Sequence, residues 1–204
     1  MTIQAVIWDF GGVLMRTQDS TPRERLAKRL GMSRVELEDL IFSGESGQRA
    51  QLGEIDIEQH WENVRLALRL SQESVTNFKS EFWKGDALDS ELVDYIRALR
   101  SGYKTGLLSN AFSNLRYVVT QVWEFSDAFD AMIISAELGM VKPNPVIYQV
   151  AAEKLGVAPE QAVFIDDFLH NVEGARAVNM HAIHFQSPGQ ACAELERLLK
   201  GDNR

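Results

Sequence analysis

The sequence predicts an α/β protein whose doubly wound parallel sheet is interrupted by a helical insert after the first strand. Two observations predict this fold class. From about residue 90 onward, short apolar runs alternate with amphipathic segments, as strands do when crossover helices join them into a parallel sheet. Between the first apolar run and that region, residues 16–85 show helical periodicity and no obvious strand. We therefore expect a core formed by residues 1–15 and 86–204, with residues 16–85 as a cap of four helices.

The first strand is expected over residues 3–8. The letters IQAVIW form a short apolar run that ends at Asp9, and the glycine pair Gly11 and Gly12 follows closely. An apolar run that leads into a glycine pair is typical of a buried strand followed by a tight loop. Asp9 is therefore expected at the carboxyl end of the first strand.

Two capping signals open the insert. Thr21–Pro22 places an N-cap residue before a proline at the first helical position, and Gly31 ends that helix. Ser33 and Glu36 form a capping box, which opens a second helix towards Phe42. The first half of the insert is therefore expected to hold two short helices.

The second half of the insert combines a polar segment with two amphipathic helices. Apolar residues recur at helical spacing over 56–70 and 72–84, which predicts a helix in each range. Residues 43–54, with the sequence SGESGQRAQLGE, are polar and glycine-rich and are expected to form a loop. In the cap position this loop would cover a ligand at the sheet edge, and Arg49 would then be a candidate contact. A plain exposed connection explains the loop equally well.

The remaining chain alternates strands and helices. After a helix over residues 90–100, the expected strands are the runs TGLLS, AMIIS, AVFID and AIHF, and the expected helices cover 113–123, 145–155, 170–178 and 190–200. Together with the first strand, these runs predict a parallel sheet of about five strands.

Composition limits the classes of function. The net charge is −8 without any basic run, which argues against binding to the phosphates of nucleic acid. The longest apolar runs are far shorter than the roughly 20 residues that span a bilayer, and no basic region precedes the first of them as in a signal peptide. Cys192 is the only cysteine, which excludes an internal disulfide and a cysteine-based zinc site. We expect a cytoplasmic protein that binds neither nucleic acid nor membrane.

Polar side chains gather at the expected strand ends. Ligands of open parallel sheets bind beyond the carboxyl ends of the strands, where Asp9, Ser109–Asn110 and Asp166–Asp167 occur. Lys142 follows another strand, in the loop VKPNP. Taken singly, each has an ordinary explanation as a turn residue, a helix cap or a solvated charge. The adjacent carboxylates are harder to explain, because like charges repel unless a cation compensates them. Together these residues predict a site at one edge of the sheet.

The order of these motifs resembles that of the haloacid dehalogenase-like hydrolases. DFGGVL, LLSN, VKPNP and FIDDxxxN match the four motifs of that superfamily, and the helical insert lies where the superfamily carries its cap. The details LGMVKPxPxIY and FxDDxxxNxxGA are most similar to the branch that includes alpha-D-glucose-1-phosphate phosphatase and the N-terminal phosphatase domain of soluble epoxide hydrolase. The resemblance implies a Rossmann-like core with a helical cap.

The resemblance also implies a nucleophile and a metal site. Asp9 would accept a phosphoryl group and so divide one difficult displacement into two easier ones. Mg²⁺ prefers about six oxygen ligands in proteins. The carboxylates of Asp9 and Asp167 and the backbone carbonyl of Gly11 would supply the protein share, with Asp166 close by or bound through water.

The phosphoryl group would have its own ligands. Ser109 and Asn110, with neighbouring backbone N–H groups, would hold the phosphoryl oxygens, and Arg49 of the cap is a further candidate. Lys142 would bridge the phosphoryl group and Asp9 as a compact positive charge. Asn171 is expected to support the residues that contact the ligands.

One position departs from the family pattern. Most phosphatases of the superfamily carry a second aspartate, a general acid and base, where this chain has Gly11. Haloacid dehalogenases also lack it, but they use no metal and would not need the pair Asp166–Asp167. We therefore expect a magnesium-dependent phosphomonoesterase that acts on a small phosphorylated metabolite such as a sugar phosphate. The alternatives are a metal-independent 2-haloacid dehalogenase and a catalytically weak protein that binds a phosphorylated ligand.

Overall fold

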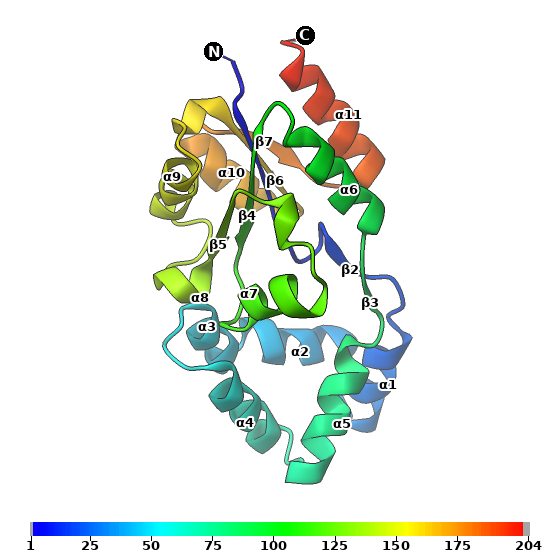
Figure 1. Cartoon of the computed structure of the whole chain (residues 1–204). Coiled ribbons are helices and arrows are strands. Elements are labelled where there is room, and N and C mark those ends of the chain that lie inside the picture. The colour runs from blue at the N-terminus through cyan, green and yellow to red at the C-terminus, as the bar shows by residue number, and fades with distance from the viewer. Residues whose placement is uncertain (1, 202–204) are drawn as a thin grey trace.

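The computed structural model describes residues 2–201, which form a core and a cap (Figure 1). Five parallel strands of the core pair in the order β5-β4-β1-β6-β7. They are β1 (Ala5–Trp8), β4 (Lys104–Ser109), β5 (Ala131–Ile134), β6 (Ala162–Asp166) and β7 (His181–His184). The predicted parallel sheet of five strands is confirmed. The chain winds in opposite directions on the two sides of β1. Ligands of such sheets bind beyond the carboxyl end of the strand at which the order reverses.

Helices cover both faces of the sheet. Successive residues of a strand point to opposite faces, and accordingly Val6 and Trp8 pack on one side while Ala5 and Ile7 pack on the other. The first face is covered by α6 (Ser90–Leu99) and α11 (Pro188–Leu199), and the second by α9 (Pro145–Lys154) and α10 (Leu169–Ala177) (Figure 1). Burial of both faces explains why the strands are continuous apolar runs in the sequence.

The cap holds one helix more than the four expected. Its helices are α1 (Thr21–Arg29), α2 (Arg34–Glu38), α3 (Glu45–Gln51), α4 (Ile57–Ala67) and α5 (Gln72–Trp83). The prediction of a loop over 43–54 is wrong, because α3 lies within that segment. No side chain caps the start of α3. Its only fully buried side chain, Ala50, packs with Ile55 and Phe112, so tertiary packing stabilises a helix that the polar sequence conceals.

A short antiparallel ribbon joins the cap to the core. It pairs β2 (Met15–Thr17) with β3 (Asp86–Leu88), and strands of three residues are too short to show a periodic signal in the sequence. Arg23 of α1 is buried and bonds Asp86 of the ribbon at 2.5 Å and Glu38 of α2 at 3.0 Å. The ribbon is thus tied to two helices of the cap.

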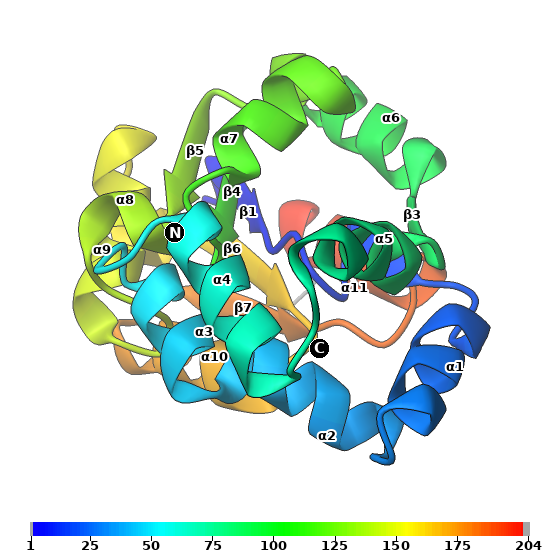
Figure 2. The same cartoon turned by 90° about the horizontal axis from the view of Figure 1, so that it is seen from below.

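Two connections of the core differ from expectation. The helix expected over 113–123 is only α7 (Leu115–Tyr117), continued by a π-helical turn (Val118–Val122), and a short helix, α8 (Ser135–Leu138), follows β5. α8 contacts α3 of the cap. In the view from below, α3 and α4 lie in front of the strands of the core (Figure 2). The cap therefore covers the edge at which the strands end.

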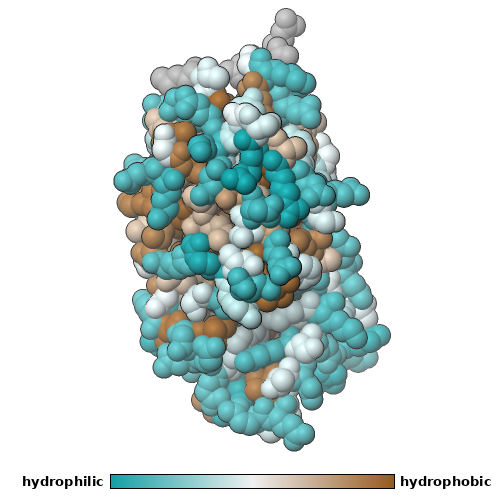
Figure 3. All heavy atoms as spheres, in the orientation of Figure 1, coloured by the Kyte–Doolittle hydropathy of each residue, from teal (hydrophilic) through white to brown (hydrophobic). Residues whose placement is uncertain are grey.

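The surface is that of an acidic globular protein. Hydrophilic side chains cover most of the cap on the face seen in Figure 3, while apolar ones show mainly over the left side of the core. Of the helices within residues 2–201, not one has the length and apolar character needed to cross a membrane.

Candidate active site

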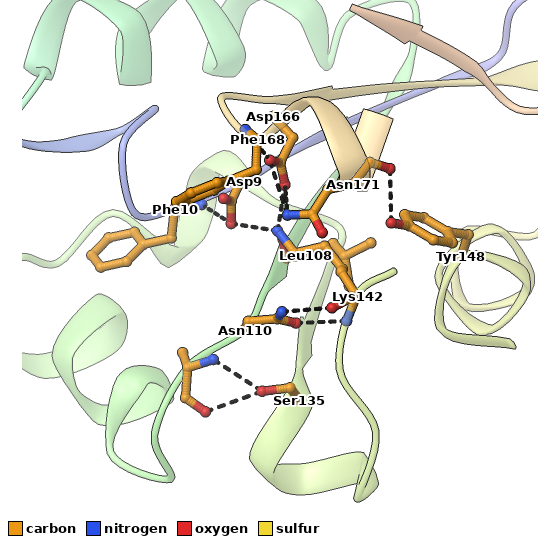
Figure 4. Close-up of polar contacts among 11 residues, drawn as sticks. Asp9, Phe10, Leu108, Asn110, Ser135, Lys142, Tyr148, Asp166, Phe168 and Asn171 are labelled. Carbon is orange, nitrogen blue, oxygen red and sulfur yellow. Dashed lines mark hydrogen bonds and ion pairs between the residues drawn. The ribbon is translucent and has the colours of Figure 1, made fainter. Parts of the chain in front are cut away.

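Three neighbouring strands deliver two aspartates and a serine to one point. Asp9 directly follows β1, and β1 pairs with β6, which ends at Asp166, and with β4, which ends at Ser109. Asp9, Ser109 and Asp166 are all buried, at 5%, 3% and 0% exposure. Figure 4 shows the carboxylates of Asp9 and Asp166 directed at the amine of Lys142.

Lys142 is a buried cation shared by two carboxylates. Its Nζ lies 2.8 Å from Asp9 Oδ1 and 2.6 Å from Asp166 Oδ2, and it donates to the carbonyl of Leu108 at 3.2 Å. Its side chain is only 1% exposed, so water does not screen these contacts. The lysine and both carboxylates therefore form one electrostatic unit.

Asp166 is engaged by the protein on both oxygens. The amide of Asn171 donates to Oδ1 and Oδ2, each at 3.1 Å, and the backbone N–H of Phe168 donates to Oδ1 at 2.7 Å. With Lys142 on Oδ2, this carboxylate is satisfied without a bound ion. Asn171 thus holds Asp166 in place, as a supporting residue would.

Asp167 is placed differently. Its Oδ1 is buried and has no hydrogen-bond partner among residues 2–201. A Cβ on Gly12, where φ is +80°, would lie 2.1 Å from Asp167 Oδ2, so a larger residue there would displace this carboxylate. One oxygen each of Asp9, Asp166 and Asp167 lies within 4.8 Å of the others. Buried polar atoms are normally paired, so the free oxygen beside two other carboxylates fits a cation as its partner.

The electrostatics agree with a missing positive charge. Burial, together with Asp166, raises the pKa of Asp9 to about 7 although Lys142 opposes the shift. Burial and Asp166 likewise raise the pKa of Asp167 to about 6. Burial alone would lower the pKa of Lys142, but Asp9 and Asp166 outweigh it and raise that pKa. One lysine thus stays charged beside three carboxylates that it cannot neutralise.

The residues predicted to bind phosphate differ in how close they lie to the carboxylates and in whether their polar groups already have partners. Ser109 ends its strand beside the carboxylates. Both groups of the Asn110 amide are committed to Lys142, whose carbonyl accepts at 3.0 Å and whose N–H donates at 2.7 Å. Arg49 lies in the cap, half exposed, and its ionic partner among residues 2–201 is Glu54, at 3.3 Å. Gly11 is exposed, and no described atom lies within 4 Å of where its Cβ would be.

The sequence did not single out three further residues near the site. His184 bonds the carbonyl of Asp167 at 2.9 Å, while His170, the histidine nearest to the acidic pair in sequence, packs on Phe168 instead. Phe112 packs against α3 and the His60 ring of α4. Ser135 bonds the turn after β4. Only tertiary contacts reveal these roles, because each residue type is common in cores and helix starts.

Comparison with known proteins places the chain in a family. A model of the haloacid dehalogenase-like hydrolases matches residues 3–179. Rat bifunctional epoxide hydrolase 2 is 30% identical over 130 residues, which cover 61% of this chain and 24% of the rat protein. This chain therefore spans about a quarter of that relative. The sesquiterpene phosphatase astK of Aspergillus oryzae is 23% identical over 97% of each chain.

A solved structure has a similar fold. The haloacid dehalogenase-like enzyme bt-2542 of Bacteroides thetaiotaomicron, in complex with magnesium and inorganic phosphate, superimposes with a TM-score of 0.74 at 22% identity. The match covers 89% of this chain and 93% of that one. With the family model matched from before β1 to beyond α10, the chain belongs to the haloacid dehalogenase-like hydrolases.

Proposed function

We propose that this protein is a magnesium-dependent phosphomonoesterase in which Asp9 takes the phosphoryl group from a small phosphorylated metabolite. The observation that carries the proposal is the buried Oδ1 of Asp167, which lies beside Asp9 and has no hydrogen-bond partner in the described part of the chain. A metal-independent dehalogenase would gain nothing from this excess of buried carboxylate. Phosphate ester cleavage needs a cation where two anions meet.

The donors of the site suit magnesium. Asp9 and Asp167 would bind it through carboxylate oxygens, and Gly11 through its backbone carbonyl. Asp166 would stay outside the metal or reach it through water, because Lys142, Asn171 and Phe168 already occupy its oxygens. When bound, Mg²⁺ would neutralise negative charge on the phosphoryl group and the carboxylates.

The chain's own residues account for the transfer. Oδ1 of Asp9 accepts the N–H of Phe10 at 2.7 Å and faces Lys142. One oxygen of this carboxylate would attack phosphorus while the other contacts the metal. The new O–P bond gives an aspartyl phosphate as the ester oxygen departs, and water then releases phosphate and restores Asp9. Lys142 supplies positive charge throughout, and Ser109 would hold a phosphoryl oxygen.

A screen for phosphate release tests the proposal. Wild-type protein with Mg²⁺ should release phosphate from some members of a panel of phosphorylated metabolites and from p-nitrophenyl phosphate, and EDTA should abolish release. Asp9→Asn keeps the shape of the side chain but removes the nucleophile, so turnover should fall by about 10³-fold or more while the fold persists. Full activity in EDTA with halide release from 2-haloacids would favour the dehalogenase. Tight phosphate binding without turnover under any metal would favour a ligand-binding protein.

A further inference from the structure

The pairing of β4 with β5 stops where the candidate phosphate site begins. The last register pair is Ser109 with Ile134, and α8 begins at the next residue, Ser135. The backbone N–H and carbonyl of Ala111 nevertheless both form hydrogen bonds with a single hydroxyl group. The Ala111 N–H donates to Ser135 Oγ at 2.9 Å, and Ser135 Oγ donates to the Ala111 carbonyl at 3.2 Å (Figure 4). Ser135 is fully buried, so water cannot replace these bonds.

The neighbouring residue is tied in the same way. The Asn110 amide bonds both the N–H and the carbonyl of Lys142. The turn formed by Ser109, Asn110 and Ala111 is thus anchored on one side to the segment that carries the buried lysine and on the other to the first residue of α8. The buried side chain of Ser135 and the partly buried side chain of Asn110 thus hold backbone that would otherwise be free to shift.

The same anchor lies beside the contact between cap and core. A Cβ on Gly53 of the cap would lie 2.1 Å from the carbonyl oxygen of Ala136, the residue after Ser135. Phe112, the residue after Ala111, packs with Ala50 and Ile55 of the cap. The hydrogen bonds between Ser135 and Ala111 therefore join two segments of the core. The cap contacts the next residue of each segment, Ala136 and Phe112.

We propose that Ser135 is a positioning residue, whose hydroxyl fixes the Ser109–Ala111 turn so that its donors face a bound phosphoryl group. This assignment rests on the proposed phosphoryl-transfer function. Within the described range 2–201, the Ser135 hydroxyl hydrogen-bonds backbone groups only, and its effect reaches the ligand through the turn.

Ser135→Ala removes the hydroxyl, Ser135→Thr keeps it, and Thr105→Val is the matched control. Thr105 is also fully buried, lies at the opposite end of β4, and donates its hydroxyl to the Ala128 carbonyl at 2.7 Å. The measurements are hydrogen exchange at the Ala111 amide, the Kd of inorganic phosphate with Mg²⁺, the Mg²⁺ affinity, and kcat and KM with p-nitrophenyl phosphate.

In Ser135→Ala the Ala111 amide should exchange faster, and phosphate should bind about tenfold to 100-fold more weakly, since misplacement by about 1 Å has effects of that order. Its Mg²⁺ affinity should be unchanged, because the carboxylates lie on other strands. Ser135→Thr should restore phosphate binding to within about threefold of wild type, and Thr105→Val should lose stability alone.

Faster exchange in Ser135→Ala with phosphate binding and KM within twofold of wild type would overturn the positioning role. So would equal losses of phosphate binding in Ser135→Ala and Thr105→Val. A wild type that binds phosphate without releasing it from any ester would reject the proposed function, while the binding and exchange measurements would still decide the role of Ser135. A wild type that neither binds nor releases phosphate overturns both.

Discussion

At the scale of single residues, the two adjacent aspartates have separate roles. Asp166 accepts bonds from Lys142, Asn171 and the Phe168 backbone, so its carboxylate organises the site. Asp167 keeps one buried oxygen without a partner among residues 2–201. Two adjacent residues of the same type therefore differ in role: Asp166 is held in place by protein groups, and Asp167 has an oxygen available for a ligand.

The difference predicts opposite effects of two matched substitutions. Asp167→Ala should weaken Mg²⁺ binding more than Asp166→Ala does. Asp166→Ala should instead destabilise the fold by about 3 kcal/mol, because it removes one partner from a buried charge cluster. Isothermal titration with Mg²⁺ and chemical denaturation measure the two quantities. Equal metal affinities in the two variants would contradict this division of roles.

Gly11 lies where most phosphatases of the family carry a general acid, and its lack of a side chain should affect the choice of substrate. Without an acid there, the leaving alkoxide must depart unprotonated or take a proton from water or from a cap residue such as Glu45 or Glu54. General acid catalysis contributes about 10²–10⁴-fold, so kcat/KM should fall steeply as the pKa of the leaving alcohol rises. Anomeric and aryl phosphates should be favoured over simple alkyl phosphates. A graded series of esters measures the slope.

Restoring the missing acid provides the complementary experiment. No described atom lies within 4 Å of a Cβ at this position, so Gly11→Asp has space at its first atom. The variant should show a flatter dependence of kcat/KM on leaving-group pKa than wild type. A flat slope already in the wild type would mean that another group supplies the proton, and Glu45→Gln and Glu54→Gln would then identify it.

At the scale of elements, α3 and the turn after it bring the cap onto the core. Gly53 has φ of +70°, and its Cα faces the carbonyl oxygen of Ala136 in α8 so closely that a Cβ would lie 2.1 Å from it. Backbone cannot yield as a flexible side chain can. The turn therefore approaches α8 only because residue 53 is glycine.

Gly53→Ala should push this turn away from α8 and raise KM several-fold, with Mg²⁺ affinity unchanged. Gly31→Ala is the matched control, because Gly31 has φ of +72° with no atom within 4 Å of its Cβ position. Both variants should lose about 1 kcal/mol of stability from the left-handed backbone. Steady-state kinetics and thermal melts separate the two effects. An identical KM in both variants would show that the contact between Gly53 and α8 does not affect how the cap covers the substrate site.

At the scale of the whole molecule, the buried carboxylates link stability to pH and metal. The pKa of Asp9 is raised to about 7 and that of Asp167 to about 6, above the ordinary value of about 4. A raised carboxyl pKa favours the folded protein when the group is protonated. In the metal-free protein this contribution is complete below pH about 4 and disappears as pH rises through 6 to 7.

Magnesium should act in the opposite direction, because it binds the ionised carboxylates. The rise in Tm produced by Mg²⁺ should therefore be small at pH 5 and should grow up to pH 8. Thermal melts in EDTA and in Mg²⁺ across this range measure the difference. Asp9→Asn should flatten the pH dependence of the metal-free protein. A Mg²⁺ effect that is constant from pH 5 to pH 8 would contradict the role of these carboxylates.

The sequence alone determined the parallel core and the order of its motifs, because those signals are local. Apolar runs between amphipathic helices specify a doubly wound sheet, and capping residues mark most helix starts. Since parallel strands end at one edge, the positions of Asp9, Ser109, Lys142 and Asp166–Asp167 indicated a shared site. The family resemblance added the chemistry expected there.

Tertiary structure decided the features that depend on contacts between distant residues. α3 is helical because Ala50 packs on Ile55 and Phe112, and the ribbon of β2 and β3 exists only through pairing of segments about 70 residues apart. The different surroundings of Asp166 and Asp167 likewise follow from which groups the fold brings to each. Burial, pairing and charge balance are properties of the assembled chain, and no local pattern of letters encodes them.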